Sequence, residues 1–137
     1  MLRLYSLFIF MTLSSIAWSQ RSDTLIIKSI YFGGGSYYID DDQIAEMQEF
    51  INGIEHIEYY EVVIFSHTDN IGGKKYNEWL SRQRSSAVYY ELLKINVPEE
   101  LIEIKDLGYK NSLYTNRSHS GRIHNRRVDI ILVPIVF

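Results

Sequence analysis

The sequence contains no cysteine, which excludes disulfides, thiolate zinc sites and a cysteine nucleophile. Positive charge is not in excess either: the formal net charge is −3, so nucleic acid is not expected as the main partner. The phosphate-binding patterns GxxxxGK[ST] and GxGxxG and the calcium-loop pattern D-x-[DN]-x-[DN]-G are absent. What is present, 46% hydrophobic and 23% charged residues over 137 positions, is typical of one small globular domain.

The N-terminal segment differs in composition from the rest of the chain. One basic residue, Arg3, precedes an apolar run from Leu4 to Leu13, and small residues follow as far as Ser19. This pattern predicts a secretory signal peptide over 1–19, with the domain formed by 20–137. The apolar run is short for a membrane span, which needs about 20 residues, and an uncleaved N-terminal anchor is the alternative. No cysteine stands at the junction, so a lipid anchor is not expected.

The rest of the sequence alternates between strand-like and helix-like periodicity. Stretches rich in β-branched and aromatic residues predict four strands, over 23–32, 59–66, 101–107 and 127–133. Apolar residues at helical spacing predict one helix from the aspartates at 40–42 to Gly53 and a longer helix over 75–95. The predicted fold class is α+β: a βαβαββ two-layer sandwich in which two main helices cover one face of a four-stranded mixed sheet.

Three local features follow from the same patterns. An aspartate at 40–42 is expected to cap the first helix, because acids are favourable at a helix N-terminus. The glycines at 33–35 predict a turn or a close approach of the backbone to another group. The residues of the long helix that are expected in the core are Trp79, Ala87, Val88, Leu92 and Leu93.

The stretch 66–84, SHTDNIGGKKYNEWLSRQR, joins a polar loop to a helix that carries an arginine. Asp69 falls in the loop after a central strand, where ligand sites of α/β sheets are usually found. Asn77, Ser81 and Arg84 are three or four residues apart and therefore share one face of the long helix. An acidic and a basic group over one groove suit a zwitterion, with its ammonium on Asp69 and its carboxylate on Arg84.

Five short sequence words occur in a characteristic order along the chain. They are HTD at 67–69, LSxxR at 80–84, LGY at 107–109, GR at 121–122 and NRRVDI at 125–130. In this order and spacing the chain resembles the family of OmpA-like peptidoglycan-binding domains, which includes domains of OmpA, Pal and MotB. The resemblance extends over nearly the whole chain after the N-terminal segment.

The resemblance implies binding of peptidoglycan in a Gram-negative envelope, without catalysis and without a metal or cofactor. In such domains the aspartate of HTD and the arginine of LSxxR hold the ammonium and carboxylate of meso-diaminopimelate in the stem peptide; here these residues are Asp69 and Arg84. By the same matching, lesser contacts are expected from Thr68, Asn77 and Arg126. The implied location is the periplasm or the outer membrane, and an envelope protein complex is a second candidate partner.

The chain also departs from the family pattern. The family often has an aspartate or asparagine after the last phenylalanine of its first strand, where this chain has Phe32 followed by three glycines at 33–35. This difference leaves open a domain that keeps the fold but binds an envelope protein partner instead of peptidoglycan.

The candidate site residues admit other interpretations. His67 and Asp69 could serve a secreted metal-dependent hydrolase, although neither an HxxxH nor an HxH spacing occurs. A structural, hydrogen-bonded histidine is the favoured interpretation of His67. Arg84 could instead form a surface ion pair with Glu78 or Glu91, which would contribute little to stability.

Arg127 and the tyrosines complete the set of candidate residues. Arg127 is expected to be structural and to pair with an acid beside the last strand. The eleven tyrosines include neighbouring pairs at 37–38, 59–60 and 89–90. In such pairs one ring usually faces the core and the other faces water, so the sequence assigns them no role in binding glycans.

Overall fold

The computed structural model describes residues 25–108 and 112–136; the expected signal peptide at 1–19 lies outside the described residues. The strands are β1 (Ile26–Tyr31), β2 (Tyr60–His67), β3 (Ile102–Gly108) and β4 (Arg127–Pro134). The α-helices are α1 (Asp41–Asn52), α2 (Lys74–Lys94) and α3 (His119–Asn125). Two short 3-10 helices, η1 (Ile57–Tyr59) and η2 (Glu99–Leu101), lead into β2 and β3.

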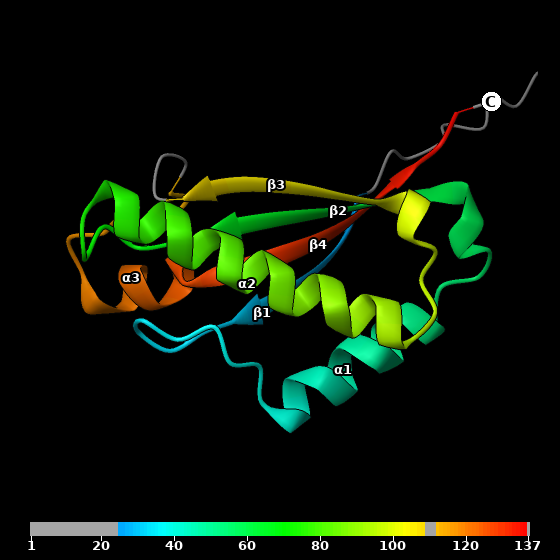
Figure 1. The fold of residues 1–137 in the computed structure, drawn as a ribbon, viewed down its shortest axis with the longest axis horizontal. Helices are drawn as coiled ribbons and strands as arrows, with labels where there is room; N and C mark the ends of the chain where they lie inside the picture. Colours follow the sequence, from blue (N-terminus) through cyan, green and yellow to red (C-terminus); the bar gives the residue numbers. More distant parts are fainter. Residues whose placement is uncertain (1–24, 109–111, 137) are drawn as a thin grey trace, which may run out of the picture.

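The four strands form one mixed sheet in the order β1-β4-β2-β3. β2 and β3 are parallel and are connected through α2, whereas β4 is antiparallel to both of its neighbours, β1 and β2. Both α1 and α2 lie over the same face of this sheet, and α3 lies at one end of it (Figure 1). The predicted α+β class, with two main helices on a four-stranded mixed sheet, is confirmed.

The core lies between the two main helices and the sheet. α1 contributes Met47 and Ile51, and α2 contributes Val88 and Leu92, all of them at most 5% exposed. These side chains pack on the buried aliphatic residues of β1, β2 and β4, which are Ile30, Val62, Ile64, Val128, Ile130 and Leu132. Burial of this continuous aliphatic cluster is the main favourable term in holding the two layers together.

The start of α1 follows the prediction. Asp40 is the N-cap, and its Oδ1 accepts a hydrogen bond from the backbone N–H of Gln43 at 2.8 Å. Asp41 and Asp42 occupy the first turn, where negative charge is stabilised by the helix dipole. The cap fixes where the chain turns after the segment that follows β1, and this segment forms one wall of the candidate site.

The buried face of α2 changes character along the helix. Its second half buries Val88 and Leu92, as predicted, but Trp79 in the first half is 41% exposed, so its predicted place in the core is wrong. Leu80 takes the inward position instead and is 3% exposed. The other buried residues of this half are polar: Asn77, Ser81, Arg84 and Ser85. The N-terminal half of α2 therefore covers polar groups rather than an apolar core.

The segment before β4 contains the short helix α3. Ser118 caps this helix by accepting a hydrogen bond from the N–H of Gly121 at 3.0 Å. A Cβ atom on Gly121 would lie 1.9 Å from the carbonyl oxygen of Thr115, so only glycine fits there. The side chain of Asn125 bonds both the N–H and the C=O of Tyr114. Gly121 and Asn125 belong to the sequence words GR and NRRVDI, so these two words shape the loop.

Within the part of the chain that the structure describes, no helix combines the length and apolarity needed to span a lipid bilayer.

Candidate functional site

A pocket of about 130 Å³ lies where three segments meet beside α2 at the end of the sheet. These are the loop after β1, the loop between β2 and α2, and the junction of α3 with β4 (Figure 1), and the first half of α2 is a fourth contributor to the lining. Three of the five predicted site residues line it: Asp69, Arg84 and Arg126. The rest of the lining is formed by Gly34, Gly35, Ile71, Tyr76 and Leu80.

Asp69 lies in the loop after β2, as expected, and is 7% exposed. Its Oδ1 accepts a hydrogen bond from the backbone N–H of Ile71 at 3.1 Å. Its Oδ2 accepts one from Nε of Arg126 at 2.6 Å. The direct ionic partner of the aspartate is thus Arg126, which the sequence placed among the lesser contacts, and not Arg84.

Arg84 is 1% exposed, so its interpretation as a surface ion pair is wrong. Its guanidinium donates to three carbonyl oxygens, those of Ser36 at 2.8 Å, Gly33 at 3.0 Å and His67 at 3.4 Å. It also lies over the ring of Phe32, 5.1 Å from the centroid. Arg84 therefore holds the loop after β1 against the end of β2.

Electrostatics keep Arg84 charged in spite of its burial. Burial lowers the pKa of Arg84 to about 10; the charge of Asp69 opposes this change, and the charge of Arg126 adds to it. Because this pKa lies well above 7, the guanidinium is protonated at neutral pH. The pocket then contains two positive charges and one negative charge, and it presents an excess of positive charge to a ligand.

The glycines at 33–35 lie close to the side chains of the site, which agrees with the predicted close approach of the backbone to another group. A Cβ atom on Gly34 would lie 3.4 Å from the guanidinium of Arg126. Gly35 has a φ of +67°, and a Cβ atom there would lie 3.0 Å from the hydroxyl of Tyr76. A side chain at either position would intrude on the pocket, so the glycines keep this wall thin.

The other two predicted contacts, Thr68 and Asn77, do not belong to the lining of the pocket. Both are 1% exposed and lie beneath the surface. The hydroxyl of Thr68 and both polar side-chain atoms of Asn77 have no hydrogen-bond partner in the structure, and neither do the hydroxyls of Ser66 and Ser81.

A second ionic network involves His67 and Arg127. Arg127 donates from Nε to both carboxylate oxygens of Asp129, at 3.1 and 3.0 Å. Asp129 is also 3.2 Å from Nε2 of His67 and accepts a hydrogen bond from the hydroxyl of Ser29 at 2.6 Å. The prediction that Arg127 pairs with an acid at the last strand is confirmed. His67 contacts the same acid through Nε2, whereas its buried Nδ1 has no hydrogen-bond partner.

This network lowers the pKa of Asp129. Burial by itself raises that pKa, but the hydrogen bonds from His67 and Ser29 and the charge of Arg127 outweigh burial, and the pKa lies below its usual value. His67 does not line the pocket. Among residues 25–108 and 112–136, no three His, Cys, Asp or Glu side chains converge as a metal-binding group.

Sequence reasoning missed Tyr76 and the direct role of Arg126. Tyr76 belongs to the same stretch as Asp69, but nothing in its spacing shows that its ring stands beside the glycine loop. The signal for Arg126 was its position next to Arg127, directly before the last strand. That position is informative only once the sheet order is known, because β4 lies beside β2 and brings the arginine to Asp69.

The sequence and the fold match the OmpA family in comparisons with known proteins. The model of the OmpA family matches residues 31–126, and this chain belongs to that family. It is similar to the outer-membrane lipoprotein YfiB of Pseudomonas aeruginosa, with 28% identity over 105 residues, 77% of this chain and 62% of YfiB. It is also similar to the peptidoglycan-binding protein ArfA of Mycobacterium bovis, with 37% identity over 71 residues, 52% of this chain and 22% of ArfA.

Among solved structures, the fold is similar to the peptidoglycan-associated lipoprotein of Burkholderia pseudomallei. The TM-score is 0.71 at 26% identity, covering 77% of this chain and 89% of that one. The chain spans less than two thirds of the length of YfiB and about a fifth of ArfA. The resemblance to OmpA-like domains that the sequence words indicated is therefore confirmed for the family and the fold.

Proposed function

We propose that this chain binds peptidoglycan in the bacterial envelope without cleaving it, and that the pocket holds the diaminopimelate of the stem peptide. The proposal rests on membership of the OmpA family and on the similarity to a peptidoglycan-binding and a peptidoglycan-associated protein. It includes export through the segment 1–19 and a location of residues 20–137 in the periplasm, in association with the outer membrane.

The observation that carries the proposal is the presence of Asp69, Arg84 and Arg126 in one small pocket. The free end of diaminopimelate carries an ammonium and a carboxylate on the same carbon, so its two charges are close together. Asp69 and Arg126 are themselves in contact, at 2.6 Å, and therefore match such a compact zwitterion. A ligand with widely separated charges would fit this pocket less well.

The three charged residues have different roles in this proposal. Asp69 accepts the ligand ammonium, because a carboxylate has about four acceptor sites and the structure uses only some of them. Arg126 is the more exposed arginine and grips the ligand carboxylate directly. Arg84 has committed three donors to backbone carbonyls and contributes its buried positive charge and its remaining N–H groups. Thr68 and Asn77 are buried behind the pocket lining and support the site without touching the ligand.

Sedimentation with purified diaminopimelate-type peptidoglycan tests the proposal. The wild-type protein is expected to sediment with the wall material, whereas Asp69→Ala and Arg126→Ala are expected to stay in solution. Glu49→Ala is the matched control, because it also removes one charge but lies exposed on α1, away from the pocket. Each variant is checked for folding by its thermal unfolding curve.

Competition with soluble ligands gives the sedimentation experiment a second readout. The free diaminopimelate-containing stem peptide is expected to release the protein from the wall, whereas the same peptide with lysine, whose side chain ends in an ammonium without a carboxylate, is not. Failure of the wild type to sediment would contradict the proposal, and so would equal sedimentation of all variants. Either result would favour the alternative of a fold that docks on an envelope protein complex.

A further inference from the structure

Three aromatic residues form an exposed row beside the pocket: Tyr76, Trp79 and Tyr37. The rings of Tyr76 and Trp79 are 5.9 Å apart at 33°, and those of Trp79 and Tyr37 are 5.9 Å apart at 90°. Each of the three side chains is more than 40% exposed. Contiguous exposed aromatic surface of this kind marks a binding surface more often than isolated apolar residues do.

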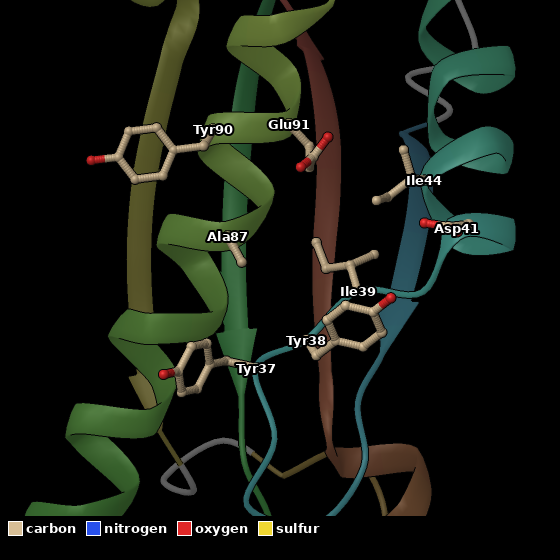
Figure 2. A pocket seen from close by; sticks show the side chains of 8 residues that line it. All are labelled: Tyr37, Tyr38, Ile39, Asp41, Ile44, Ala87, Tyr90 and Glu91. Atoms are coloured by element: carbon tan, nitrogen blue, oxygen red, sulfur yellow. The ribbon is translucent and has the colours of Figure 1, made fainter.

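The row leads into a groove between α1 and α2, with a volume of about 330 Å³. Figure 2 shows Ile39 and Ile44 pointing into the space between the two helices, with Asp41 on the α1 side and Glu91 on the α2 side. Tyr37 lies at the end of the groove next to α2. The groove therefore combines an apolar floor with carboxylates on opposite walls.

The row connects the groove to the pocket without interruption. Tyr76 belongs to the row and also lines the pocket, and Tyr37 belongs to the row and also lines the groove. The backbone makes the same connection, because Gly35 lines the pocket and lies two residues before Tyr37. A ligand anchored in the pocket can therefore extend over the aromatic row into the groove.

The pocket and the groove differ in charge and polarity. The pocket contains two arginines, whereas the groove is lined by tyrosines, aliphatic side chains and two acids, with no lysine or arginine. The Nζ of Lys94 contacts Glu91 at 2.6 Å but does not itself line the groove. A second anionic group is disfavoured in such a groove, whereas an uncharged ligand rich in hydroxyl groups is favoured.

We propose that the aromatic row and the groove bind sugar rings of the glycan strand whose stem peptide occupies the pocket. The inference rests on the proposed function. A pyranose ring has an apolar C–H face that stacks on Tyr37 or Trp79, and its hydroxyl groups can donate to Asp41 and Glu91. The groove volume accommodates about one such ring, and the covalent link between sugar and peptide requires the two sites to be neighbours, as they are.

Two soluble probes test this inference by calorimetry on the purified protein. One is the free diaminopimelate-containing tetrapeptide, and the other is the same tetrapeptide attached to its disaccharide. The wild type is expected to bind the disaccharide form about tenfold more tightly, which is the size of effect that one good aromatic stacking contact produces. Tyr37→Ala and Trp79→Ala are expected to remove this difference and to leave the affinity for the free peptide within about twofold.

Tyr59→Ala is the matched control, because Tyr59 is 52% exposed and stacks on His56 but lines neither the pocket nor the groove. Equal affinity of the wild type for the two probes would overturn the inference and leave the proposed function intact. A difference that persists in both variants would overturn it as well. Binding of neither probe would contradict the proposed function itself. A wild-type dimer that Tyr37→Ala abolishes, with no effect of the disaccharide, would assign the groove to a second copy.

Discussion

Arg126 and Arg127 are neighbours in the chain, yet they take part in two ion pairs of different character. Arg126 bonds Asp69 through one Nε contact, beside a pocket. Arg127 bonds both oxygens of Asp129, which accepts a further hydrogen bond from Ser29 and also contacts His67. The side chain of Arg126 is 16% exposed and that of Arg127 is 3% exposed.

The difference separates a pair beside open volume from a pair enclosed by the fold. Asp129 is surrounded by donors, so its pair serves the fold and has little capacity for another partner. Asp69 has fewer donors and lies beside open volume, so a ligand ammonium can still approach it. Charge alone does not identify a binding residue in this protein. Unused hydrogen-bonding capacity next to an accessible pocket is the ground on which we propose Asp69 as a ligand contact.

The largest expected effect comes from Arg127→Ala. This change leaves the carboxylate of Asp129 buried without its ion-pair partner, so the free energy of unfolding should fall by about 3–5 kcal/mol. Arg126→Ala should cost less, about 1–2 kcal/mol, because water in the pocket can solvate Asp69. Urea denaturation of both variants measures the difference. Equal losses would show that the two pairs do not differ as described.

Arg84→Ala should reduce stability by an intermediate amount. It removes charged donors from the carbonyl oxygens of Gly33, Ser36 and His67, and we expect a loss of about 2–3 kcal/mol. Faster amide exchange in the loop at 33–36 should accompany the loss. Arg84→Lys tests the geometry, since it keeps the charge but not the planar fork. Unchanged exchange in Arg84→Ala would contradict the role of this arginine in holding the loop.

Acid should weaken the Arg127–Asp129 ion pair by protonating Asp129. The pKa of Asp129 is lowered in the folded protein, so its contribution to stability is present above its unfolded value of 3.8 and is lost as the pH falls through the folded value. Unfolding curves measured between pH 5 and pH 2 should therefore show decreasing stability. Asp129→Asn should reduce the dependence on pH over this window. A dependence identical to that of the wild type would exclude Asp129 as its source.

The smallest effect is expected for Ser29→Ala. The hydroxyl of Ser29 donates one hydrogen bond to Asp129, and its removal should cost about 1 kcal/mol. The same change should raise the pKa of Asp129, because it removes one of the interactions that lower it. Carboxyl NMR titration of the variant measures the shift. An unchanged pKa would mean that His67 and Arg127 alone set the charge state.

Sequence patterns predicted the elements well because helices and strands depend on local periodicity. The α2 boundaries differ from the prediction by one residue at each end, and Asp40 caps α1 as expected. Trp79 was placed wrongly because an apolar residue in a helix was assumed to face the core. In the first half of α2 the polar side chains of Asn77, Ser81 and Arg84 are buried, while the apolar Trp79 is exposed.

The candidate site was predicted only in part. Asp69 was found from its loop position and Arg84 from helical spacing, and both line the pocket. The pairing of Asp69 with Arg126 joins residues 57 positions apart, and it depends on the antiparallel pairing of β4 with β2. The burial of Thr68 and Asn77 could not be predicted either, because it depends on how closely α2 packs on β2.

The sequence by itself determined the order of the elements, the capped start of α1 and the family to which the chain belongs, since these depend on local spacing and short words. Only the tertiary structure decided which arginine meets Asp69, which one is sealed in the fold, and that Tyr76, Trp79 and Tyr37 form one surface. The physical reason is that these contacts join side chains from distant segments. Their distances are fixed by the sheet order and the packing of α2, and no local pattern encodes them.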